Sequence, residues 1–89
     1  MPRYAVQFSA SADKALKRLP LAVQRRIVTA VEALSDDPRP AGVVKLVGDD
    51  NAWRIRVGDY RISYEIHDAR LLVLVIRIGH RRDIYRKRK

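Results

Sequence analysis

The fold is decided by residues 53–85, WRIRVGDYRISYEIHDARLLVLVIRIGHRRDIY. Apolar and polar residues alternate along 53–57 and again along 60–64, which is the period of a half-buried β-strand. Gly58 and Asp59 separate the two runs, and glycine at the first position of a two-residue turn favours a type II′ hairpin. The stretch therefore predicts two antiparallel strands joined by a tight turn.

The hairpin turn predicts which side chains share a face of the sheet, because the two strands pair outward from it. One face carries six apolar residues that a helical layer would cover: Val57, Tyr60, Ile55, Ile62, Trp53 and Tyr64. The other face pairs Arg56 with Arg61, and Arg54 with Ser63. Like charges directly opposite one another destabilise a strand pair. An anionic partner is the expected reason for the Arg56–Arg61 pair.

A third strand is predicted for residues 71–78, which are apolar on both faces almost to their end. Gly79 is expected to break or bulge this strand. Arg81 and Tyr85 lie just beyond it, where they would border the face that carries the hairpin arginines. Residues 86–89 form a short basic tail.

The first half of the chain predicts one strand and two helices. Residues 3–8 alternate as a strand, and two apolar helical stripes follow it up to about residue 35, separated by Pro20. Residues 36–52 have the composition of a loop. The predicted fold is α+β, a two-helix hairpin packed on an antiparallel sheet in the order β-α-α-β-β-β, and residues 1–89 are expected to form a single domain.

Composition excludes several classes of function. The chain has 89 residues and no cysteine, so disulfide frameworks and cysteine-based zinc sites are impossible. Two histidines without an acidic cluster give no metal site, and no cofactor is expected. No apolar run approaches the roughly 18 residues of a membrane span. We expect a cytoplasmic protein with no membrane partner.

The positive charge is concentrated in the second half of the chain. The net charge is +9, of which residues 1–52 carry +2 and residues 53–89 carry +7. The second half holds nine arginines and two lysines. Guanidinium groups suit phosphate recognition, and a localised basic surface is typical of nucleic-acid binding. A solvated basic face without a partner and an acidic protein partner remain the alternatives.

Several short motifs occur in a fixed order along the chain. After the two-helix hairpin come Lys45-Leu46, Trp53-Arg54-Ile55-Arg56, Gly58-Asp59-Tyr60-Arg61, Tyr64-Glu65, and the run from Gly79 to Tyr85. Together they resemble the RelE/ParE superfamily of small prokaryotic toxins, and the resemblance spans nearly the whole chain.

The resemblance implies a type II toxin that acts as a ribosome-dependent endoribonuclease and cuts mRNA in the ribosomal A site. Its expected partners are the ribosome, mRNA and a RelB-like antitoxin with an acidic or amphipathic segment. Operator DNA would be bound only by the toxin–antitoxin complex. The alternative is a ParE-type toxin that inhibits DNA gyrase without nuclease activity. A third reading is a module that acts only as a co-repressor.

The resemblance also implies roles for individual residues. Arg61 would stabilise the transition-state phosphate, Arg81 would lie near the leaving group, and Tyr85 would stack on or align a nucleotide. The expected RNA- or phosphate-binding residues are Arg54, Arg56, Lys45, Arg82 and Arg86.

One departure from the family pattern affects the chemistry. The best-known members carry lysines where this chain has Arg54 and Arg56. An arginine, with a pKa above about 12, is a poor general base. We therefore hypothesise that His80 assists proton transfer, because its ordinary pKa lies near neutrality. The other possibility is that catalysis depends on electrostatics and positioning alone.

Overall fold

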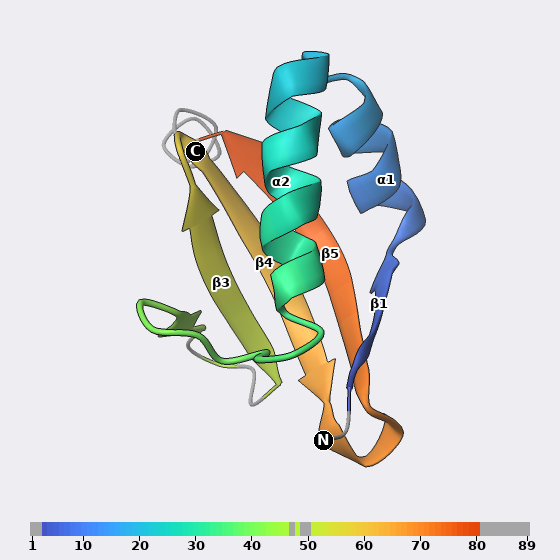
Figure 1. The fold of residues 1–89 in the computed structure, drawn as a ribbon, viewed down its shortest axis with the longest axis vertical. Coiled ribbons are helices and arrows are strands. Elements are labelled where there is room, and N and C mark those ends of the chain that lie inside the picture. Colours follow the sequence, from blue (N-terminus) through green and yellow to red (C-terminus); the bar gives the residue numbers. More distant parts are fainter. Residues whose placement is uncertain (1–2, 47, 49–50, 81–89) are drawn as a thin grey trace.

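A computed structural model describes residues 3–46, 48 and 51–80 of the chain. Figure 1 shows two helices lying together on one face of a β-sheet. The predicted α+β fold and its order are confirmed, with one short strand added. The elements are β1 (Ala5–Phe8), α1 (Ala10–Lys17), α2 (Leu21–Ala33), β2 (Val44–Lys45), β3 (Ala52–Val57), β4 (Tyr60–His67), a 3-10 turn (Asp68–Arg70) and β5 (Leu72–His80).

The sheet has five strands in the order β1-β5-β4-β3-β2, and it is mixed rather than antiparallel throughout. The hairpin β3–β4 and the pair β4–β5 are antiparallel, as predicted. β1 pairs in parallel with β5, from Ala5 opposite Leu72 to Phe8 opposite Val75. β3 and β5 run in the same direction, because both are antiparallel to β4. β1 runs in that direction too, so the first and last strands of the chain lie side by side and parallel.

The predicted loop at residues 36–52 needs a correction. Val44 pairs with Arg54 and Lys45 pairs with Trp53, which makes β2 the edge strand of the sheet. The N–H of Leu46 then donates to the carbonyl of Ala52, the first residue of β3, at 2.9 Å. A strand of two residues shows no alternation, so its sequence carries no detectable period.

The helices begin where polar residues and proline allow it. The Ser9 side chain caps α1 by accepting from the N–H of Ala12 at 3.1 Å, and this satisfies one of the free donors of the first turn. Pro20 precedes α2, and its carbonyl accepts from the N–H of Gln24 at 2.9 Å. No helix among the described residues is long and apolar enough to cross a membrane.

The core lies between the two helices and the sheet face that they cover. Its buried residues come from α1, α2, the residue that follows α2, β4 and β5, and they are Ala12, Leu16, Ile27, Val31, Leu34, Ile62, Tyr64, Ile66, Val73 and Val75. Trp53 and Tyr60 pack against this cluster and are partly buried. The prediction that these aromatic residues face the helices is confirmed.

The predicted hairpin register is also confirmed. Val57 lies opposite Tyr60, and the pairing continues along both strands. Gly58 has φ +61°, whereas no positive φ occurs at Asp59, which is the pattern of a type II′ turn. A Cβ at Gly58 would lie 3.2 Å from Nη2 of Arg26, which reaches over the turn from α2. Glycine is therefore favoured here both by backbone conformation and by space.

Gly79 does not end the third strand, contrary to prediction. β5 continues through Gly79 to His80, and the irregularity falls earlier. Ser63 pairs with Arg77 and Tyr64 pairs with Val75, so the residue between them is an extra one on β5. This β-bulge keeps apolar residues on the covered face on both sides of it.

A small polar cluster fastens the loop after α2 to the start of the chain. Asp68 accepts from the Tyr4 hydroxyl at 2.6 Å and forms an ion pair with Arg39 at 2.9 Å. The guanidinium of Arg39 and the hydroxyl of Tyr4 hold the pKa of the Asp68 carboxyl below its ordinary value. Arg39 also lies over the ring of Trp53, 5.2 Å from its centroid. The cluster joins three segments that are distant in the sequence.

The Tyr64 hydroxyl donates to the carbonyl of Pro38 at 2.7 Å in the core. Replacing Tyr64 with phenylalanine leaves that carbonyl without its donor, and we expect the free energy of unfolding to fall by about 1 kcal/mol at neutral pH. Urea unfolding of both proteins measures this change.

The same substitution has a predicted pH dependence. Burial raises the pKa of Tyr64 to about 12, while an unfolded tyrosine has a pKa of about 10. Between these values the unfolded chain loses a proton that the folded protein keeps, so stability falls as pH rises. Tyr64→Phe should lack this part of the alkaline loss. Parallel losses for both proteins between about pH 10 and 12 would contradict the assignment.

Candidate nucleic-acid interface

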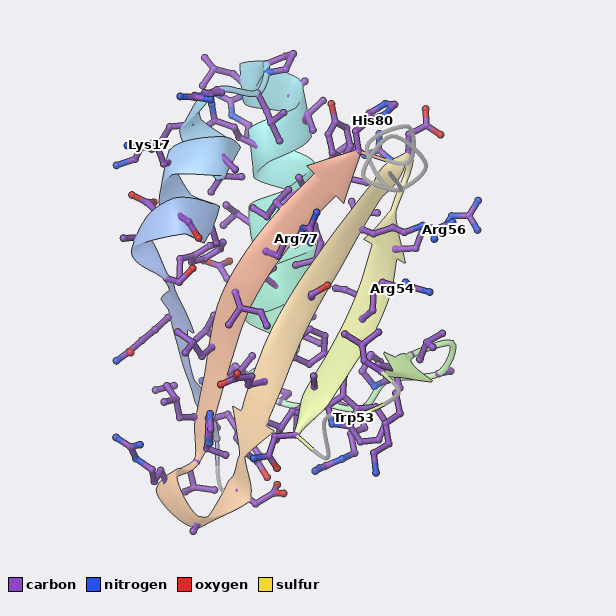
Figure 2. All side chains as sticks on the ribbon, turned by 180° about the vertical axis from the view of Figure 1, so that it is seen from behind. Lys17, Trp53, Arg54, Arg56, Arg77 and His80 are labelled. Carbon is purple, nitrogen blue, oxygen red and sulfur yellow. The ribbon has the colours of Figure 1, made fainter. Side chains whose placement is uncertain are left out.

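Four arginines lie on the sheet face opposite the helices. Successive strand residues point to opposite faces, and residues paired across strands share a face. Arg56 pairs with Arg61, while Ser63 lies between Arg54 on β3 and Arg77 on β5. We call Arg54, Arg56, Arg61 and Arg77 the arginine face. Figure 2, which views the sheet from the side away from the helices, shows three of them on their strands.

None of the four has an ion-pair partner among the residues that the structure describes. Among the described residues, the acidic groups in ion pairs have other partners, Asp13 with Lys17, Asp36 with Arg3 and Asp68 with Arg39, and the Glu65 carboxylate is hydrogen-bonded to His67. Arg56 and Arg77 are exposed, and Arg54 and Arg61 are partly so. Within the described part of the chain, the arginine face therefore presents four positive charges that no acidic group pairs with.

Arg56 and Arg61 are direct neighbours across the β3–β4 pair, as the sequence predicted. Two like charges in this position oppose strand pairing. The fold tolerates the repulsion because the covered face of the same two strands is apolar and largely buried. A phosphate group placed between the two guanidiniums would turn the repulsion into attraction.

Replacing Arg56 with threonine should stabilise the protein. Threonine suits a strand, and loss of the repulsion is expected to raise the free energy of unfolding by about 0.2–1 kcal/mol at low salt. The gain should shrink as salt screens the charges. Arg77→Thr is the control, since Arg77 lies opposite Ser63 rather than an arginine. Urea unfolding at two salt concentrations is the measurement, and an equal gain in both variants would contradict the repulsion.

Space is left beside Arg61 by the residue that pairs with it on β5. That residue is Gly79, and a Cβ built on it would meet no atom within 4 Å. At Gly79 the surface of the arginine face is therefore main chain that no side chain covers from this position. An anion can approach Arg61 from the β5 side without meeting a side chain from that position.

His80 lies on the opposite side of the sheet from the arginine face. It pairs with Tyr60, and the two rings make an edge contact with centroids 5.0 Å apart. Both residues line a hollow of about 350 Å³ that Arg18, the residue after α1, also borders. The structure does not bring His80 together with Arg61.

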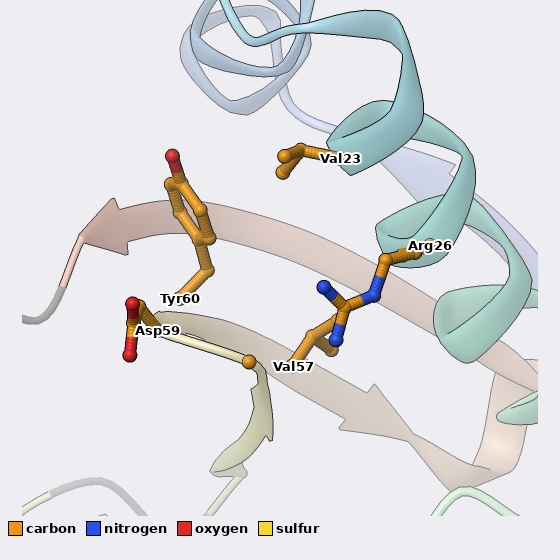
Figure 3. A pocket seen from close by; sticks show the side chains of 6 residues that line it. Val23, Arg26, Val57, Asp59 and Tyr60 are labelled. Atoms are coloured by element: carbon orange, nitrogen blue, oxygen red, sulfur yellow. The ribbon is translucent and has the colours of Figure 1, made fainter.

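Tyr60 borders a second hollow, of about 230 Å³, beside the hairpin turn. Figure 3 shows Tyr60 and Arg26 on facing walls of this hollow, with Val23 above it. Both hollows open on the helix side. The two hollows are therefore separate from the arginine face. Only the end of the β3–β4 hairpin lies between them and that face.

Lys45 is also away from the arginine face. It pairs with Trp53, and its Nζ lies 5.8 Å from the centroid of the Trp53 ring. Trp53 belongs to the covered face of β3, so Lys45 lies with it on the side opposite Arg54. This distance is within the range of a cation–π contact between β2 and β3. Four further predicted site residues lie outside the described part of the chain: Arg81, Arg82, Tyr85 and Arg86.

Arg77 also belongs to the arginine face, although it was not predicted from the sequence. The sequence places this charge at the end of an apolar strand, but the bulge at residue 76 decides which face of the sheet Arg77 occupies. A signal was present: Arg77 is the one charged residue between Leu71 and Ile78. A lone arginine in a strand flanked on both sides indicates a face that is not buried.

Comparison with known proteins identifies the family of this arrangement. The family model described as "ParE toxin of type II toxin-antitoxin system, parDE" matches residues 6–85. The chain belongs to the RelE/ParE superfamily of toxins. Among curated RelE/ParE relatives, toxin RelG of Mycobacterium tuberculosis is 35% identical over 88 residues, which cover 94% of this chain and 98% of RelG. Toxin RelE3 of Methanocaldococcus jannaschii is 31% identical, covering 90% and 93% of the two chains.

The RelE/ParE fold is also found in a solved complex. The crystal structure of the archaeal RelE–RelB complex from Pyrococcus horikoshii matches with a TM-score of 0.80 at 30% identity. The match covers 89% of this chain and 96% of the other. The two helices and five-stranded sheet described above are therefore those of a RelE-like α+β toxin.

Proposed function

We propose that this RelE/ParE toxin is a cytoplasmic, ribosome-dependent endoribonuclease that cleaves mRNA in the ribosomal A site and thereby stops translation. The observation that carries the proposal is the arginine face. Four arginines share one sheet face opposite the helices, and none of them has an acidic partner among residues 3–46, 48 and 51–80. Phosphates are the anions that such a set of guanidiniums suits best.

The proposed reaction is attack of a ribose 2′-hydroxyl oxygen on the adjacent phosphorus. The new bond is 2′-O–P, the bond that breaks is P–O5′, the 2′ proton passes to solvent water, and the 5′ oxygen takes up a proton from solvent. Arg61 would contact the phosphate as negative charge grows on its oxygens, where fixed cations lower the barrier most. Arg54, Arg56 and Arg77 would hold the neighbouring phosphates and fix the register of the strand.

The placement of His80 supports catalysis by positioning and electrostatics rather than by a histidine base. His80 contacts Tyr60 on the helix side, and Arg61 points to the other side. A general base must lie within hydrogen-bond reach of the proton that it removes, directly or through one water. In this proposal, therefore, the ribosome orients the RNA and the arginine face neutralises the charge.

The proposed partner is a cognate, RelB-like antitoxin. The P. horikoshii relative was crystallised as a RelE–RelB complex. A protein of net charge +9 also favours an acidic binding partner. The complex, rather than the toxin alone, would bind operator DNA.

Translation with purified ribosomes tests the proposal. Adding the toxin should stop protein synthesis, and primer extension should map new 5′ ends within codons held in the A site. The same mRNA without ribosomes should stay intact. Cleavage of naked RNA to the same extent, or unchanged translation, would overturn it.

One observation favours a second candidate function. The family model that matches residues 6–85 is that of the ParE toxin. ParE-type toxins are expected to inhibit DNA gyrase without nuclease activity. An arginine face can hold DNA phosphates or acidic protein groups as well as RNA. A gyrase supercoiling assay run beside the translation assay separates the two, because each candidate predicts inhibition in one assay and not in the other.

A further inference from the structure

The outward face of β4 carries one row of polar side chains: Arg61, Ser63, Glu65 and His67. The residues between them are buried in the core. Every second residue of a strand points to the same face, so neighbours in this row are about 7 Å apart. β4 lies between β3 and β5, and its residues from Tyr60 to Glu65 pair with residues on both of these strands.

Ser63 is the uncharged centre of the arginine face. Arg54 and Arg77 pair with it from the two sides, and Arg61 is its neighbour along β4. Figure 2 shows Arg54 on β3 and Arg77 on β5, with β4 between them. Ser63 is partly exposed, and no other described residue forms a hydrogen bond with its hydroxyl. A hydroxyl that can both donate and accept therefore lies open among guanidiniums, which only donate.

The positive charge ends at the next position of the row. Glu65 lies there, and its partners on the two sides are Ala52 and Leu74. The Glu65 carboxylate is hydrogen-bonded to His67 at 2.9 Å. A phosphate directly over Ser63 would be repelled by this carboxylate, so an uncharged polar group is favoured at that position.

The lengths of the side chains give the same indication. Arginine is long and serine is short, so the guanidiniums can hold phosphates around Ser63 while room is left above its hydroxyl. In a nucleic-acid strand, a sugar joins each phosphate to the next. A sugar is therefore the group that lies over Ser63 when the arginines hold the phosphates on either side of it.

We propose that the Ser63 hydroxyl forms a hydrogen bond with the 2′-hydroxyl of a bound ribose, and that Ser63 thereby selects RNA over DNA. The inference rests on the proposed function, because it takes the arginine face as the RNA site. The 2′-hydroxyl is both a donor and an acceptor, and it is the group that distinguishes the two nucleic acids. Arginines that contact phosphates position either kind of strand and read neither base nor sugar. Ser63 would thus supply a selectivity that the arginine face itself lacks.

Oligonucleotide binding without ribosomes tests this inference, because the proposed function leaves naked RNA intact. Fluorescence anisotropy compares a labelled single-stranded RNA with DNA of the same base sequence at low salt. The wild type should bind the RNA about threefold to tenfold more tightly, which is the usual effect of one hydrogen bond. RNA with fluorine in place of every 2′-hydroxyl should bind as the DNA does. This analogue keeps a ribose-like sugar conformation, so it isolates the contribution of the hydroxyl.

Three variants assign the preference to one side chain. Ser63→Ala should bind DNA as the wild type does, while its affinity for RNA should fall to the level for DNA. Ser63→Thr keeps a hydroxyl on a residue that suits a strand, and it should retain the preference for RNA. Ser11→Ala is the matched control, since it removes an exposed hydroxyl from α1 on the helix side. Circular dichroism confirms that all three are folded.

Several results would overturn the inference. Equal binding of RNA and DNA by the wild type, or no binding of either, would show that the face does not read ribose. An equal loss for both strands in Ser63→Ala would mean that Ser63 contacts phosphate. An unchanged preference for RNA in Ser63→Ala would mean that Ser63 only leaves space between the arginines.

A parallel translation assay separates this inference from the proposed function. If the preference for RNA depends on Ser63 but the wild type does not inhibit translation, the proposed function is wrong and the reading of ribose stands. If the wild type inhibits translation and the preference survives in Ser63→Ala, only the role of Ser63 is wrong.

Discussion

Replacing Arg61 with alanine is expected to reduce ribosome-dependent mRNA cleavage about 10²- to 10³-fold, the usual cost of removing one group that stabilises transition-state charge. Arg61 is partly buried beside the bare main chain of Gly79 and faces Arg56 across the hairpin. Its side chain is therefore held where a phosphate can reach it. Arg61→Lys keeps the charge but loses the planar pair of donors, so its activity should lie between those of the wild type and Arg61→Ala. Single-turnover cleavage on programmed ribosomes is the measurement.

Two control variants make this result specific. Arg25→Ala removes an exposed arginine of α2, and it should keep nearly full activity because it lies on the helix side. His80→Ala should retain most of the cleavage if positioning and electrostatics suffice. A loss in His80→Ala as large as that in Arg61→Ala, with both proteins folded, would restore the histidine to the catalytic set.

The largest expected effect on stability is that of Ile62→Ala. Ile62 has no exposed surface, and it lies on β4 between Arg61 and Ser63, with its side chain in the core. Truncation of a buried isoleucine to alanine costs about 2–5 kcal/mol. Small proteins have about 5–15 kcal/mol in total, so the variant should unfold at a Tm lower by roughly 4–8 °C for each kcal/mol lost.

Val44→Ala is the matched control, since Val44 is an aliphatic strand residue that is 47% exposed on β2. Its free energy of unfolding should change by less than about 0.5 kcal/mol. Thermal unfolding followed by circular dichroism compares the two variants. Similar losses would mean that β2 contributes to the core more than its exposure indicates.

The part of the fold predicted best was the part fixed by local chemistry. Gly58-Asp59 defined the turn, the turn defined the register, and the register placed Arg54, Arg56 and Arg61 on one face. Each step depends on neighbouring residues only. Strong local constraints of this kind leave few alternative pairings, because a slip of one residue would move every apolar side chain out of the core.

The features that were missed depend on contacts distant in sequence. The parallel pairing of β1 with β5 joins residues that are nearly the whole chain apart. The bulge in β5 moves Arg77 onto the arginine face and leaves His80 beside Tyr60. It was not predicted because residues 71–76 are apolar on both faces and give no alternation from which to count. The side on which Lys45 lies is likewise set by its pairing with Trp53, and the two residues of β2 carry no alternation that would show this from the sequence.

A sheet with helices on only one of its faces divides its residues into two classes that can change independently. Along β3 and β4, every second side chain belongs to the core, and the residues between them meet the surroundings. Systematic substitution along these strands should give a pattern of period two, with lost folding at one position and altered target binding at the next. A lineage built on such a sheet can change the molecule it poisons without rebuilding its interior.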